Sequence, residues 1–492
     1  MEEALPKLHV VDVVMMIIYF IVLLGIGYRI MMSKKKKSES ESFLAADRDM
    51  GLTRTAASAS ATDLGGGFTI AMGGLGFTMG LAGHWIITTS AISAIVVAWL
   101  MVPKIKRVVD KIQGITTGDI FEQRFDSKTG LVAAIVIGLS WFAFVGGQVI
   151  AGSRLVTTTT GLDLNTALLV SGAVILAYAT MGGLKAVIYT DVFQMAILLV
   201  GVIFLMVPIG WVAVGGWDGM ATHFAADPET ADFMGFFAVD WVTGLGWFLS
   251  VFPVWFISIA TLQRVIAAKD PETAQKGIFL TGIPIEFPLF AIGTTLIGMY
   301  ARILMPELLD IDPELALPSM MMEYLPIGIG GFVLAAYVAA VMSTADSCLM
   351  GPVAVVTRDI YQKRIKPDAT DQELTKLARI MTLVLGVLAI WLAYSVETVL
   401  EAILYAYTFG AAGLFFPMLG LLFWKGTTTT GAFASIIGGG GIAIIWVLAG
   451  NPNDIPESYL GWGVSFVLLV VVSLLTKHSP GEDIDSFFPK KQ

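Results

Sequence analysis

The sequence predicts an all-α membrane protein that crosses the bilayer about thirteen times. Of its 492 residues, 56% are hydrophobic and only 14% are charged, and the mean hydropathy is +0.79. Apolar runs long enough to span a membrane recur from end to end and leave no stretch for a sizeable soluble domain. The lipid bilayer is therefore an expected partner, whereas no nucleic-acid partner is expected.

The apolar runs give the expected transmembrane helices. They are residues 10–32, 52–80, 84–103, 131–156, 162–183, 189–215, 241–265, 277–301, 326–352, 377–396, 400–424, 430–450 and 459–476. The first run is longer than a signal-peptide core and ends in lysines without a small-residue cleavage pattern, so we expect it to remain as a helix.

A single transmembrane domain, residues 1–492, is the expected organisation, because no linker or catalytic domain interrupts the spans. Its expected parts are a first flanking helix with a basic loop (1–51), a core of spans two to eleven (52–424), two C-terminal flanking helices (425–476) and a cytoplasmic tail (477–492).

Lysines and arginines predict the orientation of the spans. The connections at 34–37, 104–107, 264–276 and 358–376 are rich in Lys and Arg and are expected in the cytoplasm, whereas those at 216–240, 303–325 and 451–458 contain neither and are expected outside. An odd number of spans then puts the N-terminus outside and the C-terminus in the cytoplasm, in a multi-pass protein of the plasma (inner) membrane.

Two spans contain breaks that an ordinary transmembrane helix would avoid, at Gly65-Gly66-Gly67 and at Ser250-Val251-Phe252-Pro253. The second and seventh spans are five apart, as the first members of two five-helix repeats would be. Interruptions at matching places in two halves are typical of inverted-repeat transporters, whose unwound midpoints bind ions and solute. The alternative is that the glycines only allow close helix packing.

The ninth span carries polar side chains that are costly at membrane depth. Ala340, Ser343 and Thr344 share one helix face, where two hydroxyls and a backbone carbonyl would suit a weakly held monovalent cation. Ser343, Asp346 and Ser347 form a second face. The hydroxyls could instead bond to carbonyls of their own helix, but Asp346 cannot satisfy itself in this way and indicates a functional site.

Two further acids lie in or beside spans. Asp63 precedes the triple glycine, and Asp191 begins the sixth predicted span. Either could simply cap a helix, Asp191 at the cytoplasmic boundary and Asp63 at the half-helix that follows the break.

Several other classes of chemistry find no support in the sequence. The single Cys348 cannot form an intrachain disulfide, and no Cys/His cluster has metal-site spacing. The sequence also contains no nucleotide-binding loop and no catalytic-triad pattern. We therefore expect no enzyme and no cofactor.

The chain resembles the sodium/solute symporter family, and in particular its proline-transporting members. The segments that carry this resemblance are 181–194 (Met-Gly-Gly-Leu-Lys-Ala-Val-Ile-Tyr-Thr-Asp-Val-Phe-Gln), 263–269 (Gln-Arg-Val-Ile-Ala-Ala-Lys), 340–347 (Ala-Val-Met-Ser-Thr-Ala-Asp-Ser), 357–361 (Thr-Arg-Asp-Ile-Tyr) and Trp-Lys followed by Gly-Ala within 424–432. The resemblance covers nearly the whole chain and implies a LeuT-type 5+5 inverted-repeat core with flanking helices, and sodium as the coupling ion.

The resemblance also implies sites. The main sodium site would use the backbone carbonyls of Ala61, Leu64 and Ala340 and the hydroxyls of Ser343 and Thr344. Asp63 matches an acid that matters for sodium coupling in proline-transporting relatives.

Some members of the family have a second sodium site, and its matching positions here are Asp191, Ser343, Asp346 and Ser347. Asp346 departs from those members, which have serine there. Two carboxylates could bind sodium more tightly or share a proton, so we expect Asp191 and Asp346 to lie close together.

The seventh span and the helix breaks bear on the identity of the solute. Sugar is unexpected, because the residues that bind it in sugar-transporting members are replaced here by Val254, Ser258 and Ile259, with only Trp255 retained. A solute carboxylate could lie at the helix N-termini of the breaks. The candidate cavity residues are Gly65, Gly66, Trp141, Gln148, Trp247, Trp255, Ser258 and Tyr407.

These observations predict a sodium-coupled symporter that imports a small organic solute by alternating access, with an amino acid such as proline as the leading candidate. The alternatives are a sodium- or proton-coupled monocarboxylate or vitamin symporter, a transporter-like sensor and a channel. The short tail after Lys477 carries no kinase domain, which argues against the sensor.

Overall fold

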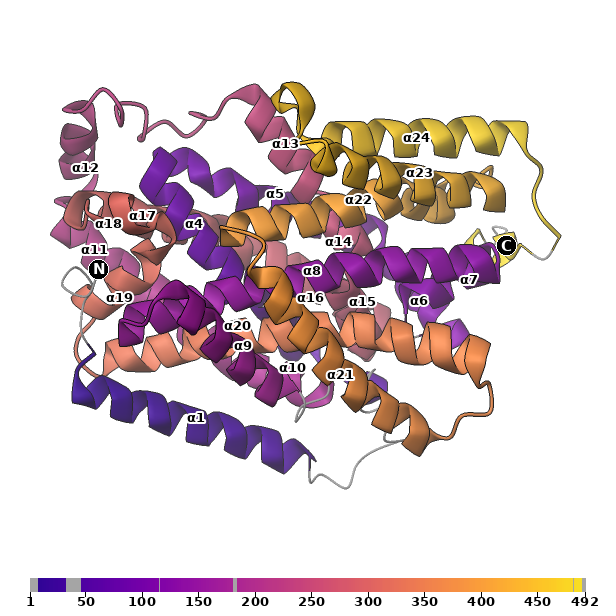
Figure 1. Ribbon diagram of the computed structural model, residues 1–492, viewed down its shortest axis with the longest axis horizontal. Helices are drawn as coiled ribbons and strands as arrows, with labels where there is room; N and C mark the ends of the chain where they lie inside the picture. The colour runs from indigo at the N-terminus through magenta and orange to yellow at the C-terminus, as the bar shows by residue number, and fades with distance from the viewer. Residues whose placement is uncertain (1–7, 32–45, 115, 180–183, 481, 489–492) are drawn as a thin grey trace.

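The protein is a bundle of helices, several of them interrupted, whose long members run roughly along one direction (Figure 1). The computed structural model describes residues 8–31, 46–114, 116–179, 184–480 and 482–488, apart from a few side chains such as that of Ser343. Ten helical segments in this part are long and apolar enough to cross a membrane, and two shorter apolar helices accompany them. The predicted all-α membrane fold is confirmed, whereas the count of thirteen spans stays a prediction.

The first half of the chain supplies the helices before the loop at 226–240. They are α1 (Val10–Met31), α3 (Leu52–Leu64), α4 (Gly66–Met79), α5 (Trp85–Leu100), α6 (Val102–Ile112), α7 (Thr117–Arg124), α8 (Ser127–Thr160), α9 (Leu164–Ala179), α10 (Leu184–Leu198), α11 (Val207–Ala213) and α12 (Gly216–Ala225), with the π-type segment η3 (Leu199–Met206) and the short 3-10 turns η1 (Ala46–Arg48) and η2 (Gly80–His84).

The second half begins with the interrupted seventh span. Its helices are α13 (Trp241–Val251), α14 (Val254–Ile257), α15 (Ile259–Ala267), α16 (Pro271–Leu280), α17 (Ala291–Leu304), α18 (Leu308–Ile311), α19 (Ala316–Tyr324), α20 (Ile329–Ala354), α21 (Asp371–Ala393), α22 (Val399–Phe423), α23 (Thr429–Leu448), α24 (Glu457–Leu475) and α25 (Ile484–Phe487), with the π-type segments η4 (Thr281–Phe290) and η6 (Val355–Ile365) and the 3-10 turns η5 (Pro313–Leu315) and η7 (Pro452–Asp454).

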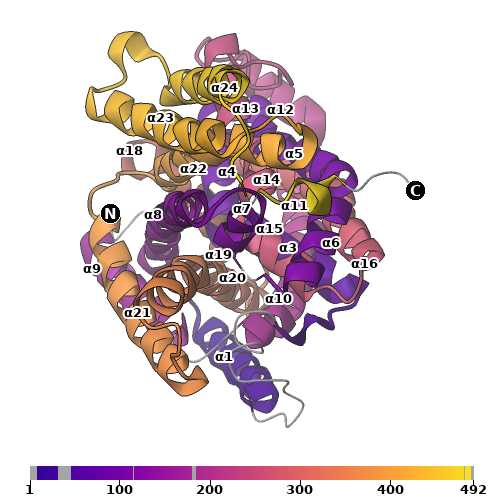
Figure 2. The same cartoon turned by 90° about the vertical axis from the view of Figure 1, so that its right-hand side faces the viewer.

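The helices differ in burial according to their place in the bundle. The most apolar window of α20 and η6 is 88% buried, whereas those of α21 and α24 are each only 28% buried. Figure 1 and the end view in Figure 2 show α23 with α24 at one edge and α1 at the opposite edge, with α8 and α20 between them. The helix with the costly polar residues is therefore central, and the exposed apolar faces of the outer helices suit contact with lipid.

The two predicted breaks differ in where they fall. The first is confirmed, because α3 ends at Leu64 and α4 begins at Gly66. In the seventh span the backbone keeps helical dihedral angles at Phe252 and Pro253 and leaves them only at Ser258 (φ −56°, ψ 124°). Helix α13 ends at Val251 and α14 begins at Val254, as predicted, but the sharper departure from helical backbone lies further along, at Ser258, because the fixed φ of proline is itself compatible with a helix.

The predicted sixth span begins earlier than expected. Helix α10 already begins at Leu184, which leaves Asp191 in the middle of the helix and fully buried. The alternative interpretation of Asp191 as a capping acid is therefore wrong, since a cap must lie at a helix end.

Candidate functional site

The break between α3 and α4 lies directly against α20. Gly65 joins the two helices with a φ of +30°, and a Cβ built on it would lie 2.9 Å from the hydroxyl oxygen of Thr344. Only glycine accommodates both this backbone conformation and this close approach. The break and the polar stretch of the ninth span therefore meet, although they are far apart in the sequence.

The predicted main sodium residues gather at this contact. The Thr344 hydroxyl donates a hydrogen bond to the Ala61 carbonyl oxygen at 3.3 Å. Leu64 ends the same helix as Ala61, and Ala340 precedes Thr344 by about one turn; all four residues are buried. Ser343 lies in α20, but its side chain is outside the described part of the structure. A hydroxyl and backbone carbonyls at a helix end are the neutral oxygen ligands that suit sodium.

The predicted second site contains a residue that the sequence analysis missed. Arg264 is 1% exposed and its Nη2 lies 3.2 Å from Oδ2 of Asp191. The same guanidinium donates hydrogen bonds to the hydroxyls of Ser58, Thr62 and Ser347 at 3.0, 2.5 and 3.1 Å. The expectation that Arg264 belongs to a cytoplasmic loop is wrong, because α15 continues to Ala267 and buries this side chain against Asp191.

Asp346 lies at the same cluster. It is fully buried, its charged neighbours are Asp191 and Arg264, and its two carboxyl oxygens accept no hydrogen bond from any described residue. The structure therefore brings Asp191, Asp346 and Ser347 together, with the guanidinium of Arg264 between Asp191 and Ser347. A buried carboxyl without donors needs a proton or a cation to offset its loss of hydration.

Asp63 connects the first break to the seventh span. Its Oδ2 accepts a hydrogen bond from the Ser90 hydroxyl at 3.0 Å, and that hydroxyl accepts one from the Trp255 indole at 2.8 Å. A small cavity of about 10 Å³ lies beside Asp63 and is also lined by Trp141, Trp255 and Ser258. Such a volume holds about one water molecule, so this conformation is closed around the cavity.

The remaining predicted cavity residues lie around this centre without lining the small cavity. Gly66 lies against Val341, since a Cβ there would be 2.0 Å from a methyl group of that side chain. Gln148 accepts a hydrogen bond from the Gly67 amide at 3.3 Å. Tyr407 stacks on Phe144, with ring centroids 5.3 Å apart.

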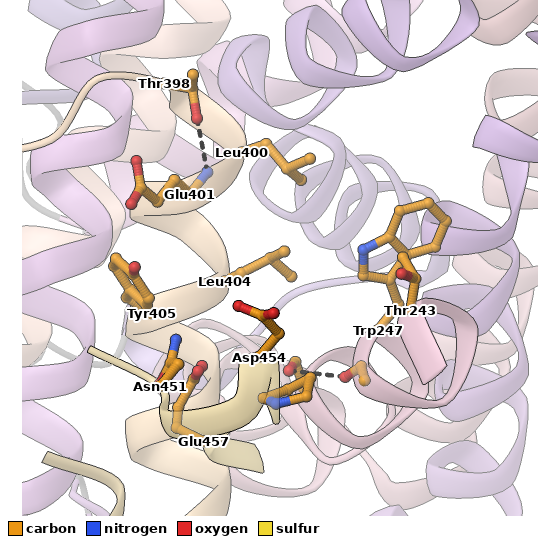
Figure 3. Close-up of a pocket in the computed structure, with 13 residues that line it drawn as sticks. Thr243, Trp247, Thr398, Leu400, Glu401, Leu404, Tyr405, Asn451, Asp454 and Glu457 are labelled. Atoms are coloured by element: carbon orange, nitrogen blue, oxygen red, sulfur yellow. Dashed lines mark hydrogen bonds between the residues drawn. The ribbon is translucent and has the colours of Figure 1, made fainter. Parts of the chain in front are cut away.

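Trp247 lines a different and larger pocket of about 440 Å³ (Figure 3). The pocket lies between the beginnings of α13, α22 and α24, and Glu401, Asp454 and Glu457 give it acidic walls. Among the described lining residues there is no Lys or Arg. Ser250 also lines it and accepts a hydrogen bond from Thr408, the neighbour of the buried Tyr407. The structure thus keeps Trp247 apart from Trp141 and Trp255.

The sequence analysis also missed Glu286. This acid lies in η4, is fully buried, and its carboxyl is close enough to that of Asp63 for a hydrogen bond between them if one is protonated. The signal was present in the sequence, since a lone acid in an apolar span, flanked by Pro284 and Pro288, meets the criterion that drew attention to Asp346.

Sequence comparisons show which proteins this chain is similar to. It is 30% identical over 475 residues to the osmoregulated proline transporter OpuE of Bacillus subtilis (strain 168), with 94% of each chain covered. It is also 30% identical to the high-affinity proline transporter PutP of the same organism, with 95% of this chain and 98% of that one covered. The sodium/proline symporter of Staphylococcus aureus (strain USA300) is 27% identical, with 96% and 94% covered.

Solved structures share the fold. A Na+-coupled sialic acid symporter in a substrate-bound, outward-open state superposes with a TM-score of 0.74 at 20% identity, covering 96% of this chain and 99% of that one. Mhp1, a nucleobase-cation-symport-1 family transporter, in a closed conformation, gives a TM-score of 0.57 at 14% identity, covering 91% and 95%.

A model of the sodium:solute symporter family matches residues 43–439, which is most of the chain. The resemblance found in the sequence is thereby confirmed, and with it a multi-pass membrane transporter that uses sodium as its coupling ion and is not an enzyme. The chain belongs to the sodium:solute symporter family.

Proposed function

We propose that this protein imports a small amino acid of the proline type together with sodium, by alternating access. The solute assignment is supported by the relatives named as proline transporters, which align with this chain over nearly its full length. The observation that best supports sodium coupling is the hydrogen bond from Thr344 to the Ala61 carbonyl, since it joins the end of α3, at the helix break, to α20.

Sodium at Ala61, Leu64, Ala340, Ser343 and Thr344 would act as a clamp between two elements. An ion that binds the two elements together favours the conformation in which they are in contact, because differential affinity shifts the population. Asp63 follows Ala61 by two residues and lines the small cavity, so ion binding at the break would also position an acid at the solute cavity. This arrangement supports coupling between ion and solute.

The solute is proposed to bind against Trp141, Trp255 and Ser258. Ser258 caps α15 by accepting a hydrogen bond from the Thr261 amide at 3.0 Å, and Ala260 of the first turn lines the cavity. The positive end of this helix suits a solute carboxylate. In the closed conformation the cavity is too small for an amino acid, so entry would require the bundle to open; the acidic pocket at Trp247 is a candidate entrance.

The proposed orientation puts the N-terminus outside and the C-terminus in the cytoplasm, as the distribution of Lys and Arg indicates. The larger pocket would then open to the outside. A cysteine introduced at the exposed Glu229 should react with an impermeant reagent added to intact cells; reaction only after the cells are opened would contradict this orientation.

The proposal is tested by uptake into proteoliposomes that contain the purified protein. An inward sodium gradient should drive proline above its equilibrium level, and this accumulation should vanish when potassium replaces sodium. Other amino acids, monocarboxylates, vitamins and sugars are compared in parallel, with a proton gradient imposed separately. Accumulation of a monocarboxylate or vitamin in place of proline would overturn the solute assignment, and the absence of sodium-driven uptake of every solute would overturn the coupling.

A second cation or proton site at Asp191, Ser343, Asp346 and Ser347 is also proposed. We expect Asp346→Ser to change the number of sodium ions transported per solute or the pH dependence of uptake, because it removes a buried carboxyl that accepts no described hydrogen bond. Both quantities are measured in the same proteoliposomes, with Asp310→Ser at an exposed position as the matched control. If the stoichiometry and the pH profile both remain those of the parent protein, the second site is refuted.

A further inference from the structure

A third span is interrupted, and its interruption carries an acid. Within η4 the backbone leaves helical dihedral angles at Ile283 (φ −133°, ψ 124°) and at Phe287 (φ −119°, ψ 127°), on either side of Glu286. Pro284 and Pro288 cannot donate the N–H that would satisfy a carbonyl one turn earlier. Irregular backbone at membrane depth is tolerated where it is buried in protein or lines a cavity, and it frequently provides ligands for ions.

The carboxyl of Glu286 lacks the hydrogen bonds and ion pairs that usually stabilise a buried carboxylate. Its side chain is fully buried, and both of its carboxyl oxygens lack a hydrogen-bond partner among the described residues. Its carboxyl instead faces that of Asp63. Neither carboxyl forms an ion pair with a Lys, Arg or His of the described part of the chain. Two neighbouring acids at this depth need a proton or a cation to offset their loss of hydration and their mutual repulsion.

The surroundings of the pair are built of oxygen and fit tightly. The Ser90 hydroxyl binds Asp63 at 3.0 Å, which adds a third side chain with a hard oxygen atom. The segment that carries Glu286 packs closely on α5, since a Cβ on Gly282 would lie 2.9 Å from the Ala91 carbonyl oxygen. The cavity of about 10 Å³ beside Asp63 has room for one water-sized species, but it is lined by Arg264 and not by Glu286 or Ser90, so it is not itself the proposed ion position.

We propose that Glu286 and Asp63, with the Ser90 hydroxyl, bind a monovalent inorganic cation of the sodium class, at a site separate from that of Thr344. The proposal extends the proposed sodium coupling but does not depend on which solute is transported. Asp63 follows Ala61 by two residues, so this ion would lie next to the main sodium site along the chain. Through Ser90 it would also hold the indole of Trp255 at the solute cavity.

The test measures binding of radioactive sodium to the full-length protein in lipid nanodiscs without solute, so that it does not depend on the solute assignment. Glu286→Gln keeps the shape of the side chain but removes its charge. We expect the variant to lose one bound ion per protein at sodium concentrations that saturate the parent, with the half-saturating concentration of this site raised by about tenfold or more. Glu323→Gln, at an exposed position, is the matched control and should bind as the parent does.

The other occupants give different results. Unchanged sodium binding in Glu286→Gln would mean that the two carboxyls share a proton, and would overturn the proposal. Unchanged sodium binding with weakened solute affinity at saturating sodium would assign the pair to the amine of the solute, and would also overturn it. If Glu286→Gln does not fold, Glu286→Asp and Ser90→Ala are measured in the same way, and normal ion counts in both would contradict the site. Failure of every solute to accumulate, with the ion count of Glu286→Gln reduced, would refute the proposed function and leave this site standing.

Discussion

Thr344→Ala is expected to raise the sodium concentration for half-maximal transport by about tenfold or more, which corresponds to about 1.4 kcal/mol of binding free energy for each factor of ten. The substitution removes the hydroxyl that contacts the Ala61 carbonyl, and with it one of the proposed side-chain ligands. The maximal rate at saturating sodium should change much less if the hydroxyl serves mainly to bind the ion. Initial rates of uptake over a range of sodium concentrations measure both quantities.

Two further variants separate ion binding from packing. Thr344→Ser keeps the hydroxyl and should restore most of the sodium affinity, whereas a purely steric role would leave it as impaired as the alanine variant. Thr382→Ala makes the same substitution at a buried threonine of α21, whose hydroxyl donates to the Ala378 carbonyl of its own helix. Sodium dependence should be normal in that control. A normal sodium dependence in Thr344→Ala would rule out the proposed main sodium site.

Much of the fold follows from the sequence because a bilayer imposes a simple requirement. A spanning segment must satisfy its backbone internally and must be apolar for about 20 residues, so hydropathy locates it. The break at Gly65 was predictable in part, since glycine weakens a helix and tolerates a positive φ. Glycines alone do not specify a break, because Gly438 to Gly441 lie within the uninterrupted helix α23. The meeting of Ala61 with Thr344 followed from helix periodicity together with the family resemblance, although the coordination itself remains a proposal.

Glu286 meets the criterion that singled out Asp346 and could have been found from the sequence, whereas Arg264 was missed because it lies near the end of an apolar span. Counting Lys and Arg near the ends of spans cannot distinguish an arginine that faces the cytoplasm from one that turns inward. The inward position of Arg264 depends on Asp191, which lies 73 residues earlier in the sequence. Likewise, the place of Glu286 depends on how a kinked segment packs on α5, and no local pattern specifies that contact.

The pairing of Arg264 with Asp191 leads to the second large expected effect. Asp191→Asn should destabilise the protein by about 3–5 kcal/mol, because it leaves a fully buried guanidinium without its carboxylate. The double variant Asp191→Asn with Arg264→Gln should recover much of this loss, since removing both charges removes the cost of burying either one. Thermal and denaturant unfolding of the purified proteins in detergent would measure the coupling as a double-mutant cycle.

Substitution of Arg264 alone distinguishes two roles for this cluster, a cation site and a purely structural ion pair. In the structure the guanidinium of Arg264 bonds to both Asp191 and Ser347, two of the residues proposed for the second cation site. The guanidinium therefore occupies a position that a bound cation could otherwise take. If an ion and the guanidinium compete for Asp191, sodium should stabilise Arg264→Gln against unfolding more than it stabilises the parent, because the ion can replace the missing charge and ligand binding to the folded state raises its stability. A purely structural ion pair would leave the variant weakened by the same amount with sodium or with potassium. Equal stabilisation in both salts would therefore remove Asp191 from the proposed second site and keep it as the partner of Arg264.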